Sequence, residues 1–71
     1  DDYLKRLGAA FPRLNLNDQR LCAYLRMDLQ TKDIAPLMNI SVRSVEMARY
    51  RLRRKMGLSR DVNLSDFLQK F

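Results

Sequence analysis

The hydrophobic pattern most constrains what this chain can fold into. Apolar residues recur every three or four positions, and no stretch alternates every two. Spacing of three and four places side chains on one face of an α-helix, whereas a half-buried strand needs strict alternation. The breaks between the apolar groups also carry residues that favour helix ends. The sequence therefore predicts an all-α fold built as a small helical bundle.

Proline ends the first of five expected helices. This helix covers residues 2–10 and stops at Phe11, because Pro12 disfavours helical geometry in the residue before it. Its apolar side chains are expected on one side, at Tyr3, Leu4, Leu7 and Phe11.

Asparagine followed three residues later by aspartate marks the start of two further helices, because this pair can form a variant of the capping box. Asn15 and Asp18 begin a helix that is expected to end near Met27. Its buried residues are expected to be Leu21, Cys22 and Leu25. Asn63 and Asp66 begin the last helix. Its apolar stripe consists of Leu64, Phe67, Leu68 and Phe71, and this stripe is either core or half of a dimer interface.

Two helices joined by a tight turn lie between these. The first begins near Thr31, whose hydroxyl can cap a free backbone N–H, and Pro36 should keep it short or slightly bent. Its inward side chains are expected to be Ile34, Leu37 and Met38. Ser41 caps the second, which covers residues 42–56 and ends at Gly57, the residue best suited to the left-handed closing conformation.

The charge of the chain is concentrated in residues 41–60. This stretch holds seven cationic side chains and one anionic, so it accounts for the whole net charge of +6. A block of positive charge on one element attracts a polyanion, and nucleic acid is the commonest candidate. The alternative is a solvated helix face that only confers solubility.

Composition argues against an enzyme. The chain has no histidine and a single cysteine, which excludes histidine acid–base catalysis, His/Cys zinc sites and an intrachain disulfide. Cys22 is expected to be a small core residue, and no cofactor or metal is predicted. No apolar run approaches the roughly 20 residues of a membrane span, and no signal peptide opens the chain, so a cytoplasmic location is expected. The first residue is aspartate, which favours a domain excised from a longer chain.

The expected helix over residues 42–56 has two distinct faces. Its core stripe should consist of Val45, Ala48, Leu52 and Met56, with the stem of Arg49 at the border. The opposite sector holds Arg43, Glu46, Met47, Tyr50 and Arg54, flanked by Arg51 and Arg53. Phosphate binding needs only cations, whereas contact with base edges in the major groove needs chemical variety.

Each of these polar-face residues has a possible DNA contact and a simpler role. Arg43 could bind guanine, Glu46 could accept from a cytosine amino group, and Met47 could touch a thymine methyl. Alternatively, Glu46 forms intrahelical ion pairs with Arg43 and Arg49. Met47 could instead be an isolated surface residue, and Tyr50 could pack against a neighbouring arginine or helix.

A short helix, a tight turn and a patterned helix describe a helix-turn-helix, and three motifs make the comparison specific. Residues 29–35 read LQTKDIA, residues 40–46 read ISVRSVE, and residues 52–58 read LRRKMGL. This pattern resembles the LuxR/GerE family of bacterial transcription regulators over residues 14–71 without insertions. Region 4 of sigma factors is the nearest competitor, but the LRRKMGL ending and the capped helix after it favour LuxR/GerE. The chain departs from the family pattern at Asp18, Asp28 and Ala48, where members usually have glutamate, glycine and histidine.

The resemblance implies roles for individual residues. By matching position, Glu46, Met47 and Tyr50 are expected to contact bases, and the chemistry of the helix face adds Arg43. By the same match, Thr31, Lys32, Ser44, Arg51 and Arg54 are expected at the DNA backbone. Ser41, Arg53 and Lys55, in the same basic segment, are expected there too. The final helix often forms the dimer interface in the family, which would give this role to Leu64, Phe67, Leu68 and Phe71.

The predicted organisation is therefore an N-terminal helix and linker over residues 1–13, followed by a four-helix LuxR-type helix-turn-helix domain over residues 14–71. The predicted function is sequence-specific binding of double-stranded DNA by the output domain of a two-component or sensor-linked regulator. A homodimer on DNA and an upstream sensory or receiver domain are expected, without membrane contact by this segment. The alternatives are an RNA-binding module or a domain that binds an acidic protein partner.

Overall fold

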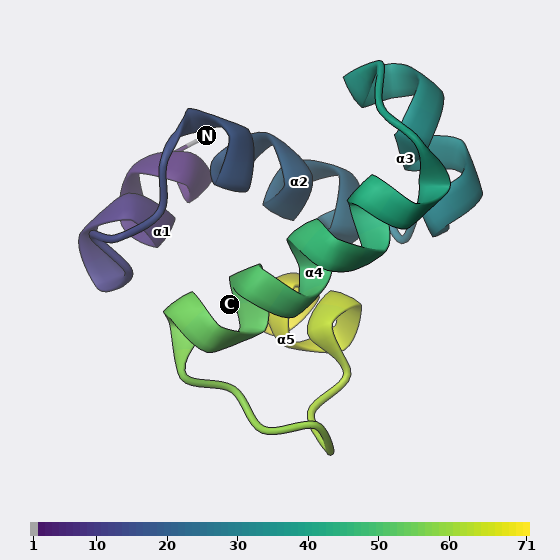
Figure 1. Cartoon of the computed structure of the whole chain (residues 1–71). Helices are drawn as coiled ribbons and strands as arrows, with labels where there is room; N and C mark the ends of the chain where they lie inside the picture. The colour runs from purple at the N-terminus through teal and green to yellow at the C-terminus, as the bar shows by residue number, and fades with distance from the viewer. Residues whose placement is uncertain (1) are drawn as a thin grey trace.

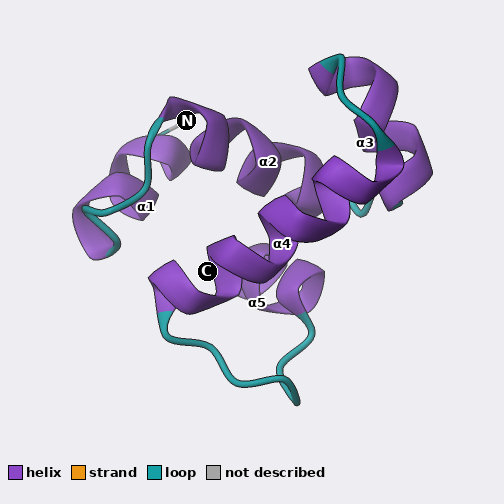
Figure 2. Cartoon of the chain, viewed as in Figure 1, coloured by secondary structure: helices purple, strands orange, loops and turns teal. Residues whose placement is uncertain are grey.

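The computed structural model describes residues 2–71, and in this part of the chain five helices and no strand are present. The helices are α1 (Tyr3–Ala10), α2 (Leu16–Arg26), α3 (Thr31–Met38), α4 (Val42–Met56) and α5 (Leu64–Lys70). Figure 2 shows helices joined by short loops. The all-α fold is confirmed. Asp1, the first residue of the predicted segment 1–13, lies outside the described residues.

Helix α4 crosses the bundle and is its longest element (Figure 1). Helix α3 packs against α4, and α2 packs against both α5 and α4. Helix α1 lies beside α2 at the end of the bundle away from α3 (Figure 1). The loop over residues 57–63 projects from the bundle between α4 and α5 (Figure 1). The helix-turn-helix pair α3 and α4 thus packs against the rest of the bundle through α2.

The predicted caps are confirmed at three helix starts. The Asn15 side chain accepts the Asp18 backbone N–H, and the Asp18 carboxylate accepts the Asn15 backbone N–H, so α2 begins with a complete capping box. The Ser41 hydroxyl accepts from the Ser44 backbone N–H at the start of α4. Asn63 caps α5 in the same way. These caps explain why α2, α4 and α5 begin close to where the sequence indicates.

The predicted ends of α3 and α4 are also confirmed, but the cap of α3 is not. Gly57 closes α4 with φ of +69° in the left-handed region, and α3 is short, ending two residues after Pro36. Thr31 is the first helical residue of α3, and its N-cap is Gln30, which makes no side-chain cap hydrogen bond. The predicted capping role of Thr31 was therefore wrong.

Leu4, predicted on the apolar side of the first helix, and Leu37, predicted to lie inward, are both exposed. Leu4 is 44% exposed, because α1 buries only the face that carries Tyr3 and Leu7. Leu37 is 51% exposed, because α3 turns Ile34 and its neighbour Ala35 into the bundle instead. A short helix that packs on one side buries a narrow stripe, and a residue one or two positions from this stripe faces solvent.

The core joins residues from all five helices of the described chain and from the loop before α2. Its buried members are Tyr3, Leu7, Leu14, Leu21, Cys22, Leu25, Ile34, Ala35, Val45, Leu52, Met56, Leu64 and Leu68. The prediction that Leu21, Cys22 and Leu25 form the buried side of α2 is confirmed.

Helix α1 contacts α5, although the two helices lie at opposite ends of the sequence. The Tyr3 hydroxyl donates a 2.6 Å hydrogen bond to the Leu68 carbonyl, and the Arg6 guanidinium donates to the Phe71 carbonyl at 3.1 Å. The Phe71 ring also lies edge-on to the Tyr3 ring, with centroids 6.0 Å apart, and contacts the Phe11 ring at 5.9 Å. The apolar stripe of α5 therefore packs as core against the N-terminal helix.

Candidate nucleic-acid interface

Helix α4 is one uninterrupted rod from Val42 to Met56. Fifteen residues at a rise of 1.5 Å give a length of about 22 Å. Val45, Leu52 and Met56 form its buried stripe, as predicted, while Ala48 and Arg49 lie half-buried at the border. The buried stripe fixes the rod to the bundle and leaves the opposite face in solvent.

The four residues predicted to contact bases all lie on this exposed face. Met47 is 45% exposed and Tyr50 is 55% exposed, and both Arg43 and Glu46 are also exposed. The Arg54 guanidinium lies 5.9 Å from the centre of the Tyr50 ring, so the phenol and this cation are held together. The structure thus places cations, a carboxylate, a thioether and a phenol on one side of one helix.

The residues predicted at the DNA backbone fall into two groups. Five are exposed: Lys32, Ser41, Ser44, Arg51 and Arg54. Three are half-buried: Thr31, Arg53 and Lys55. Thr31 and Lys32 begin α3, where the free backbone N–H groups of a helix N-terminus point outward. The exposed group therefore lies at the start of α3 and on α4 and its N-cap, close to the four residues predicted to contact bases.

Arg53 is engaged within the chain. Its guanidinium Nη1 donates to the Ser59 carbonyl at 3.1 Å and to the Val62 carbonyl at 2.5 Å. Both acceptors belong to the loop over residues 57–63, so the side chain folds this loop back onto α4. The predicted phosphate contact of Arg53 competes with this role, because Nη1 is already used.

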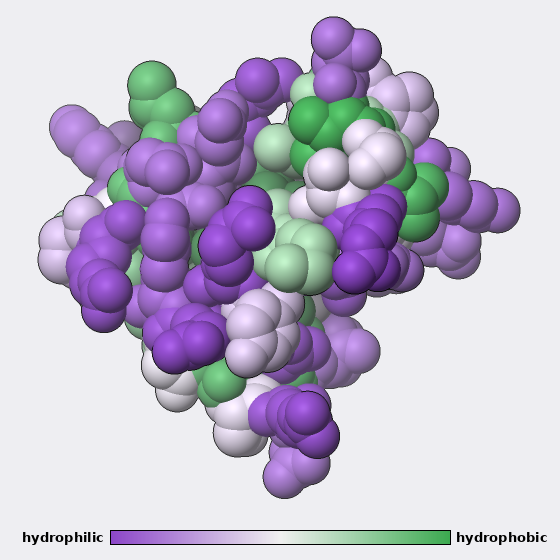
Figure 3. Space-filling model, in the orientation of Figure 1, coloured by the Kyte–Doolittle hydropathy of each residue, from purple (hydrophilic) through white to green (hydrophobic). Residues whose placement is uncertain are grey.

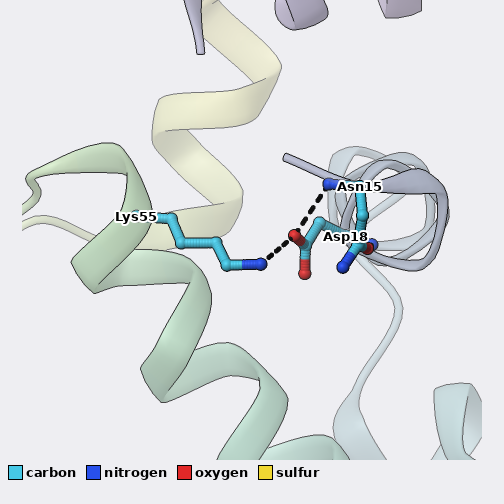
Figure 4. A network of polar contacts seen from close by, with 3 residues as sticks. All are labelled: Asn15, Asp18 and Lys55. Carbon is cyan, nitrogen blue, oxygen red and sulfur yellow. Dashed lines mark hydrogen bonds and ion pairs between the residues drawn. The ribbon is translucent and has the colours of Figure 1, made fainter. Parts of the chain in front are cut away.

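Lys55 is also engaged within the chain, and Asp18 is its partner. The Lys55 Nζ lies 2.5 Å from Oδ2 of Asp18, and the same oxygen accepts the Asn15 backbone N–H at 3.0 Å. Figure 4 shows the lysine reaching from α4 toward this carboxylate at the start of α2. Lys55 was predicted at the DNA backbone, and this contact, which ties α4 to the bundle, was not predicted from the sequence.

Burial shifts the pKa of two side chains, one on α4 and one on α2. It lowers the pKa of the Arg49 guanidinium, and the neighbouring Arg53 charge lowers it further. Burial raises the pKa of the Cys22 thiol to about 12, and the Asp18 carboxylate adds to this effect. A fully buried thiol with a raised pKa is a poor nucleophile, which agrees with the predicted core role of Cys22.

The stripe predicted as a dimer interface is largely covered in this chain. Leu64 is 1% exposed and Leu68 is fully buried, because α2 packs against α5 and Tyr3 of α1 reaches the Leu68 carbonyl. Phe67 and Phe71 are half-buried and keep some surface. Leu64 and Leu68 therefore serve the core of the single chain, and a second chain could reach only Phe67 and Phe71 without displacing α1.

The space-filling view shows a mostly hydrophilic face on the side of the molecule that carries α4 (Figure 3). Hydrophobic side chains gather over α3 and the turn into α4, at the upper right of the view. The exposed apolar residues of this region are Leu37, Ile40 and Val42. No helix in residues 2–71 combines the length and apolarity needed to cross a bilayer.

Two exposed arginines outside the predicted set lie beside α4. Arg60 lines a hollow between α4 and the loop that follows it. Arg20 lines a second hollow between α4 and the start of α2. Periodicity within α4 could not reveal either residue, because both reach the helix from other segments of the chain.

Comparison with known families agrees with this geometry. The family described as bacterial regulatory proteins, luxR family, matches residues 20–68, which include α3 and α4 entirely. Neither the curated proteins nor the solved structures gave a significant match. The matched stretch covers more than half of the 71 residues. The chain therefore belongs to the luxR family of bacterial regulatory proteins, which are DNA-binding transcription regulators.

Proposed function

We propose that this chain binds double-stranded DNA sequence-specifically, with α4 in the major groove, as the output domain of a bacterial transcription regulator. The observation that carries the proposal is the exposed face of α4, an unbroken helix braced from behind by a buried stripe. The major groove is about 12 Å wide and admits one α-helix. A helix presented in this way can enter the groove without rearrangement of the bundle.

The chemistry of the exposed face suits base recognition. Arg43 can donate two hydrogen bonds to guanine, Glu46 can accept from cytosine, and Met47 can contact the methyl group of thymine. Tyr50 lies on the same face, where Arg54 holds its ring. A surface that served only solubility would have no need of a half-exposed thioether and phenol among its charges.

Contacts to phosphates would fix the register of α4. Lys32 and the free backbone N–H groups at the start of α3 suit one phosphate. Ser44, Arg51 and Arg54 are exposed on α4 and suit contacts to further phosphates. Arg53 instead holds the loop over residues 57–63 and Lys55 positions α4, because both side chains are bound to other parts of the chain.

The wider assembly belongs to the same proposal. The DNA-binding unit covers residues 14–71, with α1 as an addition that packs on α5. Two such units would bind neighbouring half-sites as a homodimer, using Phe67 and Phe71. A sensory or receiver domain upstream, linked to two-component signalling, would control the unit in the bacterial cytoplasm. The proposed activity is binding without catalysis and without a cofactor.

The alternative nucleic acid is single-stranded RNA. Proteins that bind single strands stack successive bases on several exposed aromatic rings. Tyr50 is the one exposed aromatic side chain within residues 2–71. The structure of the surface therefore favours a duplex over a single strand.

Competition between ligands tests the proposal. The chain should bind labelled duplex DNA, with an affinity that falls steeply as salt rises, and unlabelled duplex should displace it far better than single-stranded RNA. Stronger displacement by RNA would establish the RNA-binding alternative. Weak DNA binding without salt dependence would favour an acidic protein partner.

A further inference from the structure

Helix α4 is bordered by a cationic hollow on one flank. Its walls come from one side of α4 and from the loop over residues 57–63, and it encloses about 640 Å³. Its charged residues are Arg49, Arg53, Arg54, Arg60 and Glu46. The two hydrogen bonds from Arg53 to the loop hold the outer wall, which carries Arg60, against the helix.

A second hollow lies on the other flank of α4. It encloses about 310 Å³ between α4, the start of α2 and the end of α3. Its charged residues are Arg20, Arg51, Lys55 and Asp18. The ion pair between Lys55 and Asp18 holds this flank of α4 to α2. Both hollows are therefore net positive, and in both an intrachain contact fixes the wall.

The two hollows lie on opposite flanks of α4, and the first also includes Glu46 and Tyr50 from the face proposed to contact bases. Within α4, residues 46, 49, 50, 53 and 54 line the first hollow, and residues 44, 48, 51 and 55 line the second. At about 100° per residue these sets are centred on opposite flanks, and Met47 lies on the strip between them. A helix with its side chains is about 10–12 Å across and fills the major groove, so the two DNA backbones pass along its two flanks.

From this arrangement we propose that each hollow receives phosphates of one DNA strand, and that Arg60 and Arg20 are DNA-backbone contacts supplied from outside the helix-turn-helix. The inference rests on the proposed function and names further contacts of the same interface. Both arginines are exposed, and neither makes an intrachain hydrogen bond or ion pair within the described residues. Each guanidinium is therefore available to a phosphate, in contrast to Arg53 and Lys55.

The salt dependence of binding to a duplex of random sequence tests this inference. Each neutralised phosphate contributes about −0.9 to the slope of log affinity against log salt. Arg60→Ala and Arg20→Ala should each make the slope shallower by about this amount, so that the affinity lost between 50 and 200 mM salt shrinks about threefold. Arg60→Lys and Arg20→Lys should retain most of the slope, because they retain the charge.

Arg13→Ala is the matched control, because Arg13 is exposed, lies outside both hollows and carries the same charge. Slopes for Arg60→Ala and Arg20→Ala equal to that of Arg13→Ala would overturn the inference while leaving the proposed function intact. An effect at only one arginine would contradict the two-strand arrangement. If the unaltered chain fails to bind duplex at any salt concentration, the proposed function itself falls, and this inference with it.

Discussion

Lys55 and Asp18 form an ion pair of 2.5 Å that joins the C-terminal half of α4 to the first turn of α2. The Asp18 oxygen that accepts from the lysine also accepts the Asn15 backbone N–H of the capping box. One carboxylate therefore both starts α2 and holds α4 against it. The ion pair thus adds to the buried stripe of α4 in holding this helix against the bundle.

Replacing Asp18 should reveal both of its roles. Asp18→Ala removes half of the capping box and the ion pair, so it should lower the free energy of unfolding by about 1–2 kcal/mol. Asp18→Asn keeps an oxygen for the Asn15 N–H but loses the charge, so its cost should stay below about 1 kcal/mol, as expected for a partly exposed pair. Urea unfolding measures both values. Equal losses in the two variants would show that the capping oxygen contributes nothing.

The attachment of the N-terminal helix α1 to α5 should depend on the hydroxyl of Tyr3. Tyr3→Phe removes the hydrogen bond to the Leu68 carbonyl within a buried contact, which should cost about 1 kcal/mol. Tyr24→Phe is the control, because Tyr24 is half-buried and its hydroxyl makes no hydrogen bond to the described residues. Thermal unfolding compares the two. If both variants unfold at the same temperature, the attachment of α1 to α5 does not rest on this bond.

Stability should fall in alkaline solution because of Cys22. Its pKa is about 12 in the folded chain, against 9.0 for an unperturbed thiol, so the unfolded chain loses this proton first as pH rises. The contribution of Cys22 to the free energy of unfolding is fully present below pH 9 and is lost as pH rises from there toward 12. The pKa of Tyr3 is raised by burial and acts in the same direction. The urea midpoint should therefore drop from pH 8 to pH 10.

The variant Cys22→Ala separates the thiol from the rest of the alkaline effect. It is expected to be less stable at pH 8, because it leaves space in the core. Its urea midpoint should nevertheless change less between pH 8 and pH 10 than that of the unaltered chain. The same pH dependence in both chains would place the alkaline effect elsewhere.

Most of the fold could be predicted from the sequence, because short-range signals mark where the helices begin and end. The capping residues Asn15, Ser41 and Asn63 act within one turn of the chain, and Gly57 acts through its own backbone freedom, so each could be recognised from neighbouring residues alone. The orientation of Leu37 could not be recognised in this way. Its exposure depends on which side of α3 meets the bundle, and sequence spacing leaves this undecided.

The site was predictable to a similar extent. The exposed face of α4 follows from helical periodicity, because its buried stripe is strongly apolar. The partners of Arg53 and Lys55 could not be foreseen, since Asp18 lies 37 residues before Lys55 and the acceptors of Arg53 are carbonyls of an irregular loop. A cation in a basic segment has the same appearance in sequence whether it binds phosphate or its own chain.

Loss of a backbone contact should weaken binding to every sequence alike. Arg51→Ala and Arg54→Ala should each reduce affinity for specific and random duplexes by the same factor and flatten the salt slope by about one counterion. Arg53→Ala should differ, because this side chain holds the loop over residues 57–63 and its loss should lower stability as well. Fluorescence anisotropy at several salt concentrations measures the effect. Unaltered affinity for both Arg51→Ala and Arg54→Ala would contradict the docking of α4 on DNA.

The central claim is that the exposed face of α4 contacts bases, and selection of binding sites from a random duplex library tests it most directly. The unaltered chain should enrich a defined sequence. Glu46→Gln and Tyr50→Ala should each change the preferred base at particular positions of that sequence, while Arg51→Ala, as the control, should leave it unchanged. Enrichment of the same sequence by all of these variants, or of none by the unaltered chain, would contradict the account.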